Sequence, residues 1–182
     1  SSLENKTNCE ARFYLLKAFR KDRKYAKAFA EANKIVNTCG EPWKKKALYF
    51  AGLLQNIRPN KNANYVYDEF LEKYKNHSYS DDMLYWKARV ALEFEGEKAY
   101  FKILNRLINQ YPGGDYFFQA GFELAIHAAE EGQETKAQGY LNRLKSSKRL
   151  SLIQLDQIAY WQARLKIYPK PNYLIKTRHK DR

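Results

Sequence analysis

Apolar residues recur along most of this chain at steps of three and four residues, the spacing of one face of an α-helix. In one stretch Met83, Trp86 and Val90 are interleaved with charged residues in this way. The strict alternation typical of strands is absent, and glycine and proline fall mostly between the periodic stretches. The sequence therefore predicts an all-α chain. The expected helices cover residues 8–21, 24–38, 42–57, 61–74, 80–95, 97–111, 115–131, 134–146 and 152–168.

The expected helices also repeat in pairs, because every second one begins about 36 residues after the last. Alanines occupy similar places in these even-numbered helices, and another residue follows each of them seven positions later. The alanines are Ala28, Ala63, Ala99 and Ala137, and the later residues are Ile35, Phe70, Arg106 and Leu144.

The odd-numbered helices carry a ring, which in four of them is followed three positions later by a small residue. The rings are Tyr14, Tyr49, Tyr85, Phe122 and Tyr160, and the small residues are Gly52, Ala88, Ala125 and Ala163. A small side chain one turn from a ring lets the next helix approach closely, as in tetratricopeptide-type repeats. We therefore predict a right-handed superhelix of about four and a half stacked antiparallel helical hairpins, with Trp86 and Trp161 in its core.

Breaks in the pattern suggest where the helices begin and end. Ser80 or Asp81 can cap the fifth helix and Asp115 the seventh, and Gly96 and Gly132 suit hairpin turns. Residues 1–168 are predicted to form one helical-repeat domain, and the Pro-bounded, basic segment 169–182 a tail or linker. No stretch approaches the about 20 apolar residues of a membrane span.

The only two cysteines lie at the start of the first helix and the end of the second, and these ends are neighbours in an antiparallel hairpin. Cys9 and Cys39 could therefore form a disulfide, which would stabilise the fold by roughly 3–4 kcal/mol through its loop of about thirty residues. The alternative is two unpaired thiols in a cytosolic repeat protein. We expect the disulfide, and with it an extracytoplasmic, for example periplasmic, location.

The formal net charge is +13, and the first sixty residues, with 13 basic and 5 acidic side chains, carry +8 of it. Such a surface can attract an anionic envelope polymer, an acidic protein, a lipid surface or nucleic acid, although solvated helix ends would look the same. The expected disulfide disfavours nucleic acid. The candidate contacts with an anionic partner are Arg20, Lys21, Arg23, Lys24, Lys27, Lys44, Lys45 and Lys46.

No self-contained active site is apparent. His77, His127 and His179 are widely spaced, and zinc-ligand spacings, phosphate loops and nucleophile motifs are absent, so we expect no metal, cofactor or catalytic residue. Asp81 and Asp82 point about 100° apart on a helix and suit a helix start better than acid–base catalysis. Glu130 and Glu131 suit a solvated helix end.

Several segments in order resemble one family. They are Cys9-Glu10-Ala11-Arg12 with the turn at 23–26 and Cys39, His77 to Asp82, Tyr111-Pro112-Gly113-Gly114-Asp115, and Tyr160-Trp161-Gln162-Ala163-Arg164. Together they are similar to the helical superhelix that precedes the catalytic module in soluble lytic transglycosylases, periplasmic enzymes that cleave peptidoglycan. That family's catalytic glutamate belongs to a later lysozyme-like domain, whose motifs do not occur here, so no catalytic residue carries over.

The resemblance implies either a helical region of a larger enzyme or a stand-alone relative without the enzyme. We expect a non-catalytic, extracytoplasmic module that positions or binds peptidoglycan or a cell-wall enzyme. The alternative is a free-standing tetratricopeptide adaptor that binds a protein or peptide partner of the cell envelope in its concave groove.

Overall fold

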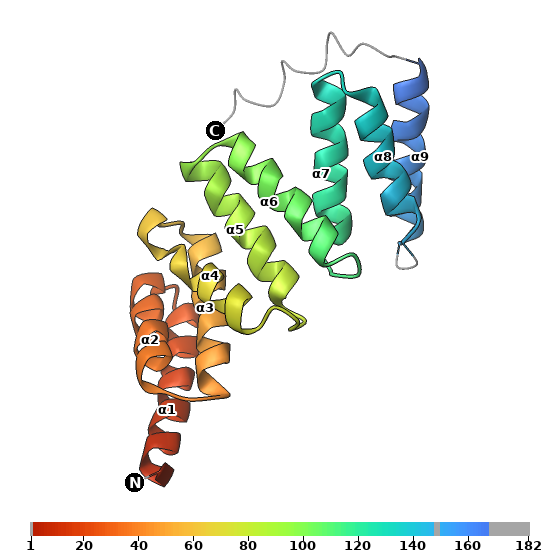
Figure 1. Cartoon of the computed structure of the whole chain (residues 1–182). Coiled ribbons are helices and arrows are strands. Elements are labelled where there is room, and N and C mark those ends of the chain that lie inside the picture. The colour runs from red at the N-terminus through yellow and green to blue at the C-terminus, as the bar shows by residue number, and fades with distance from the viewer. Residues whose placement is uncertain (1, 148–149, 168–182) are drawn as a thin grey trace. The chain divides into compact units, whose positions relative to one another are not determined.

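The computed structural model describes residues 2–147 and 150–167, which form nine α-helices, one short 3-10 helix and no strand (Figure 1). The prediction of an all-α chain is confirmed. No helix in the described part of the chain is both long and apolar enough to cross a bilayer. The helices are α1 (Ser2–Lys21), α2 (Tyr25–Thr38), α3 (Trp43–Ile57), η1 (Lys61–Ala63), α4 (Tyr65–Lys73), α5 (Ser80–Phe94), α6 (Glu97–Gln110), α7 (Phe117–Glu130), α8 (Glu134–Lys145) and α9 (Leu152–Ile167).

The chain divides within α6 into two compact units, Ser1–Ile103 and Leu104–Arg182. In the first unit each of the helices α1 to α5 packs on the next, and α3 also packs on both α1 and α5. Their apolar stripes meet in one core because each helix buries its face at three- and four-residue spacing. The largest side chains that are fully buried there are Leu16, Ile35, Leu48, Tyr67, Phe70, Met83 and Leu84.

In the second unit α7 packs on α8, and α8 packs on α9. Gly121 of α7 permits a close approach to α8, because a Cβ there would lie 2.6 Å from the Cδ2 atom of Leu144. Arg143 of α8 donates hydrogen bonds to the carbonyl oxygen of Ile108 at 2.7 Å and to the Asn109 side chain at 2.6 Å. These contacts tie α8 to the last turn of α6. The predicted tail, 169–182, lies outside the described residues.

The repeat alignment is wrong by one residue in the third pair. Ala28, Ala63 and Ala137 are buried as expected, but Arg106 is exposed and Ala99 is only half-buried. Tyr100 and Leu107 instead take the buried places of α6, again seven residues apart. An alanine is small enough to sit beside the buried stripe of a helix, so it is a poor marker of register.

The pairing of a ring with a small residue holds in the middle of the chain and fails at α9. Gly52, Ala88 and Ala125 are buried, whereas Ala163 is exposed, and Tyr14 and Tyr160 are exposed rings. Trp86 is a core residue as predicted, but Trp161 is only half-buried. Helix α9 packs mainly on α8, with the Trp161 ring also 6.4 Å from that of Phe122 on α7, and Leu152 and Ile153 stay exposed.

The glycine turns were predicted correctly and the side-chain caps were not. Gly96 and Gly132 have φ angles of 87° and 71°, the left-handed backbone that glycine favours. The N-cap residues of α5 and α7 are Tyr79 and Tyr116, and neither makes a side-chain cap. Ser80 lies inside α5, and its hydroxyl donates to the carbonyl oxygen of Tyr74 at 2.7 Å.

Candidate binding surface

The eight basic residues proposed from the sequence lie in two groups within the first unit. Arg20, Lys21, Arg23, Lys24 and Lys27 surround the turn between α1 and α2, and Lys44, Lys45 and Lys46 lie in the first turn of α3. Phe13 lies beside Trp43 and Arg20 lies over the ring of Phe50, so α1 and α3 run side by side in the same direction. At about 1.5 Å per residue, the two groups are therefore separated by about two turns of helix along α1, or roughly 10 Å. Arg20 and Lys46 come nearest to each other, because they lie over the neighbouring rings of Phe50 and Phe13.

The end of α3 adds a basic residue to the first group that sequence reasoning missed. The Arg58 guanidinium carbon lies 5.5 Å from the ring centroid of Tyr25, the first residue of α2. Nothing in the spacing of Arg58 reveals this, because the contact depends on how α3 packs on α2. We define the turn group as Arg20, Lys21, Arg23, Lys24, Lys27 and Arg58.

The turn group keeps most of its positive charge. Among the described residues its ion pair is the one between Lys24 and Asp22, at 3.2 Å, and both side chains are more than half exposed. An exposed pair of this kind contributes little energy because water and salt screen it. The turn group is therefore a surface at which positive charge remains open to an anionic ligand.

Arg23 holds an unusual backbone conformation in the middle of this group. Its φ angle is +57°, in the left-handed region that costs a non-glycine residue about 1–2 kcal/mol. The turn closes with a 2.8 Å hydrogen bond from the Lys24 amide to the Phe19 carbonyl oxygen. Glycine is the usual residue at such a helix end. An arginine at this position adds a positive charge to the turn, but its left-handed backbone conformation costs free energy.

The second group is engaged within the protein. The Lys44 and Lys73 amines lie 3.2 and 2.7 Å from the same Glu69 oxygen, on α4. The Lys45 amine lies 5.8 Å from the ring centroid of Tyr74, and Lys46 lies 4.6 Å from that of Trp43. Lys44 and Lys45 thus hold α3 against α4, so they are weaker candidates for contact with a ligand than the turn group.

Burial and neighbouring groups around the α3–α4 contact shift the pKa values of three side chains. Burial alone would raise the pKa of Glu69, but hydrogen bonds from Lys73 and Lys44 outweigh it, so that the pKa lies below its usual value. Burial and the hydrogen bond to Glu41 raise the pKa of Tyr74. Burial and the charge of Lys45 lower the pKa of His77.

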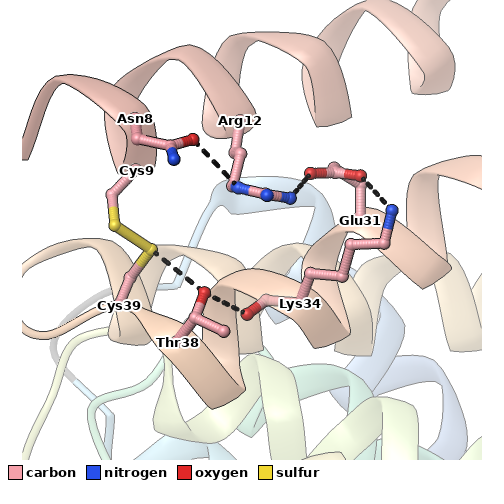
Figure 2. Close-up of polar contacts among 7 residues, drawn as sticks. All are labelled: Asn8, Cys9, Arg12, Glu31, Lys34, Thr38 and Cys39. Carbon is pink, nitrogen blue, oxygen red and sulfur yellow. Dashed lines mark hydrogen bonds and ion pairs between the residues drawn. A yellow bond between two sulfur atoms is a disulfide. The ribbon is translucent and has the colours of Figure 1, made fainter. Parts of the chain in front are cut away.

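Cys9 and Cys39 form the predicted disulfide, which links α1 to the residue after α2 (Figure 2). Their Cα atoms are 5.9 Å apart. Beside the disulfide lies a carboxylate that the sequence reading did not single out, Glu31 of α2. It contacts Arg12 at 2.8 Å through one oxygen and Lys34 at 3.2 Å through the other, and its side chain is 6% exposed (Figure 2).

This polar cluster is structural in character. Both oxygens of Glu31 are occupied by cations, and Arg12 is in turn oriented by the Asn8 side chain at 3.1 Å. If a buried ion pair loses one partner, the other charge is left uncompensated, and the folded state is destabilised. The cluster and the disulfide together fix α1 on α2.

The remaining polar candidates do not converge on a site. Asp81 is buried in the first turn of α5, and Glu130 and Glu131 are exposed. The His77 ring accepts a hydrogen bond from the Tyr79 amide at 3.2 Å. His127 lies half-buried in α7, and His179 is outside the described residues. Within the described ranges, no group of three or more His, Cys, Asp or Glu residues is arranged to hold a metal ion.

Neither protein-family models nor curated proteins give a match to this sequence.

Proposed function

We propose that this chain is a non-catalytic, extracytoplasmic helical-repeat module that binds and positions an anionic cell-wall polymer, peptidoglycan, through the turn group. In this proposal the helical pairs stack as a right-handed superhelix of about four and a half hairpins, as in the helical region that precedes the catalytic module of soluble lytic transglycosylases. A polymer strand bearing carboxylates meets the basic end of the first hairpin.

The observation that carries the proposal is the convergence of six basic side chains from three helices on one end of α1, α2 and α3. Positive charges held close together repel one another, and a bound anionic ligand lowers this electrostatic free energy. The strained backbone of Arg23 supports the same reading, because strain that evolution tolerates concentrates at functional positions.

The disulfide supports the extracytoplasmic part of the proposal. Disulfides persist in oxidising compartments and are rare where cellular thiols keep cysteines reduced. Cys9 and Cys39 are both buried, at 8% and 7% exposure, so they are poorly placed for a transient redox role at the surface.

The non-catalytic part rests on how the carboxylates are used. Cleavage of a glycosidic bond requires at least one carboxyl group that is held near the bond in an enclosed, apolar setting and has a raised pKa. Glu31 is held by two cations, Glu69 is held by two lysines and has a lowered pKa, and Glu130 and Glu131 are solvated. None of these meets that requirement.

A binding assay with isolated peptidoglycan sacculi tests the proposal. The protein should co-sediment with sacculi at low salt and be released at high salt, because charge attraction is screened over about 8–10 Å under ordinary conditions. The double variant K21E/K27E should reduce retention several-fold. The matched control is K98E/K102E, which makes the same change in net charge at two exposed lysines of α6.

Equal losses in both variants, or retention that salt does not change, would contradict binding through the turn group. Release of anhydro-muropeptides from the sacculi would contradict the non-catalytic part. Competition by an equal charge concentration of double-stranded DNA distinguishes a general polyanion surface from one that prefers the wall.

The second candidate function is an adaptor that binds a protein partner. The observation that favours it is an exposed apolar stripe on α3, which the turn group does not explain.

A further inference from the structure

One side of α3, next to α1, carries mostly apolar residues that remain partly exposed. Its residues follow one another at steps of three, four, three and four, the spacing of one helix face. We call them the α3 outer stripe: Trp43, Lys46, Phe50, Leu53 and Ile57. Trp43, Phe50 and Leu53 are half-buried, and Ile57 is 42% exposed. The stripe adjoins the face of α3 that fills the core with Ala47, Leu48, Ala51 and Leu54, and α1 packs beside it. A surface helix ordinarily carries polar residues where its core face ends.

Cations accompany the rings along the stripe. Phe13 of α1 is buried and lies 5.6 Å from the Trp43 ring and 5.3 Å from the Phe50 ring, so both half-buried rings pack on α1. The Lys46 amine lies 4.6 Å from the Trp43 ring, and the Arg20 guanidinium carbon lies 5.4 Å from the Phe50 ring. Among the described residues, neither cation is paired with a carboxylate.

We propose that the α3 outer stripe docks an amphipathic helix of a protein partner whose apolar face is flanked by acidic residues. This inference rests on the second candidate function, the adaptor, and shares one residue, Arg20, with the turn group. The stripe runs from Trp43 to Ile57, about 21 Å along α3, the length of about four turns of a partner helix.

A helix fits this surface better than an extended peptide does. An extended peptide gains affinity mainly by main-chain hydrogen bonds to an exposed sheet edge, and α3 uses its own backbone groups internally. A partner helix also satisfies its own backbone. It needs only side-chain contacts, which the apolar residues of the stripe supply at matching three- and four-residue steps.

A glycan fits it less well for a related reason. Sugar hydroxyls that leave water need hydrogen-bond partners, and each one left without a partner costs free energy. Phe50, Leu53 and Ile57 offer none, and the Trp43 indole nitrogen is buried. Aromatic rings with an arginine beside them, as found on this stripe, are instead typical of protein–protein interfaces.

The unpaired cations determine the sign of the partner's charge. Acidic side chains on the flanks of the partner helix would meet Arg20 and Lys46 next to the rings. A basic helix would be repelled there, and like charges in contact are costly at an interface.

Fluorescence anisotropy with the full chain tests the proposal. The probes are three labelled 16-residue helical peptides that share one leucine face and differ only in their flanks, which are glutamate, glutamine or lysine. The glutamate peptide should bind at least about tenfold more tightly than the lysine peptide. Added salt should reduce the difference in affinity between the glutamate and lysine peptides.

Two variants connect binding to the stripe. Ile57→Glu and Lys46→Glu should each weaken binding of the glutamate peptide by about tenfold, since each places a carboxylate against the glutamate-flanked peptide. The matched control is Leu15→Glu, because Leu15 is 43% exposed and lies about 200° around α1 from Phe13. Thermal unfolding of each variant verifies that it folds, and sacculus retention of the uncharged variant Ile57→Ser should be unchanged.

Several results would overturn the proposal. The first is that the glutamate peptide does not bind at a protein concentration of about 1 mM. The second is that all three peptides bind with equal affinity. The third is that Leu15→Glu weakens peptide binding as much as the stripe variants do. Displacement of the glutamate peptide by peptide-free glycan strands would assign the stripe to carbohydrate instead. If the unmodified protein failed to bind sacculi but bound the glutamate peptide, the wall-binding proposal would be refuted and this one would stand.

Discussion

The buried Tyr67 hydroxyl on α4 donates a 2.9 Å hydrogen bond to the carbonyl oxygen of Gly52 on α3. Burial raises the pKa of this phenol, so it remains a donor at physiological pH. The bond is possible because α3 carries no side chain at this point. A Cβ on Gly52 would lie 2.6 Å from the Met83 sulfur and 3.2 Å from the Tyr67 ring.

Gly52→Ala should therefore destabilise the fold by about 1–3 kcal/mol, since Met83 is fully buried and has little room to move. The matched control is Gly139→Ala in α8, where no atom lies within 4 Å of the added Cβ. That change should instead stabilise by about 0.5–1 kcal/mol, the ordinary preference of a helix for alanine. Urea unfolding measures both, and a stabilising Gly52→Ala would refute the close approach of α3, α4 and α5.

Loss of the Cys9–Cys39 disulfide should lower the free energy of unfolding by about 3–4 kcal/mol, because the link closes a loop across a sequence separation of 30 residues. The double variant C9A/C39A, compared with the oxidised protein in urea, measures this. Thiol titration of the unfolded, unreduced protein should find no free thiol. Two free thiols in protein prepared from an oxidising compartment would contradict the link.

Arg23→Gly should raise stability while it weakens wall binding. The substitution removes the cost of a left-handed arginine, about 1 kcal/mol after the greater freedom of glycine in the unfolded chain is subtracted. It also removes one charge from the turn group. Arg23→Lys, which keeps the charge and the strain, is the control. If Arg23→Gly lowered the urea midpoint, the turn would owe its shape to the arginine side chain.

Glu69→Gln should remove part of the acid sensitivity of the fold. Because the folded pKa of Glu69 lies below its unfolded value, the unfolded state binds more protons between the two. Its contribution is present above the unfolded pKa, about 4.3, and is lost as the pH falls through the lower folded value. The variant should be less stable than the parent at pH 7 and closer to it near pH 3, by urea unfolding at each pH. An equal deficit at both values would rule out a role for the charge.

Because Lys44 contacts Glu69, charge reversal at Lys44 is a poor test of ligand binding. Lys44→Glu would place a second carboxylate against Glu69, where the amine now lies 3.2 Å away. A loss of binding in that variant could come from a loosened α3–α4 contact, so the exposed Lys21 and Lys27 are better sites for the test.

Sequence reasoning succeeded where local pattern alone determines the outcome. The helices follow from the spacing of apolar residues, and the Cys9–Cys39 link follows because the ends of a hairpin must meet. It failed where the answer depends on tertiary neighbours. Asp115 does not cap α7, because backbone hydrogen bonds such as that from the Phe117 amide to the Gly114 carbonyl oxygen form the turn instead.

The binding candidates show the same division. The basic run at Lys44 to Lys46 and the basic turn looked alike in sequence, and only the position of Glu69 and Tyr74 on and after α4 distinguishes them. Arg58 joined the turn group through its contact with Tyr25, which no local spacing predicts. The α3 outer stripe was hidden because its residues are as apolar as those that fill the core.

The disulfide also decides how the first hairpin carries mechanical load. Its turn joins α1 to α2 at one end and the sulfur bridge joins them at the other, so residues 9–39 form a covalently closed ring. A pull on the N-terminus cannot peel α1 away beyond Cys9. The tension passes through the bridge to Cys39 and directly toward α3, so the part of the chain inside the ring, which includes Arg20 to Lys27, is shielded from the force.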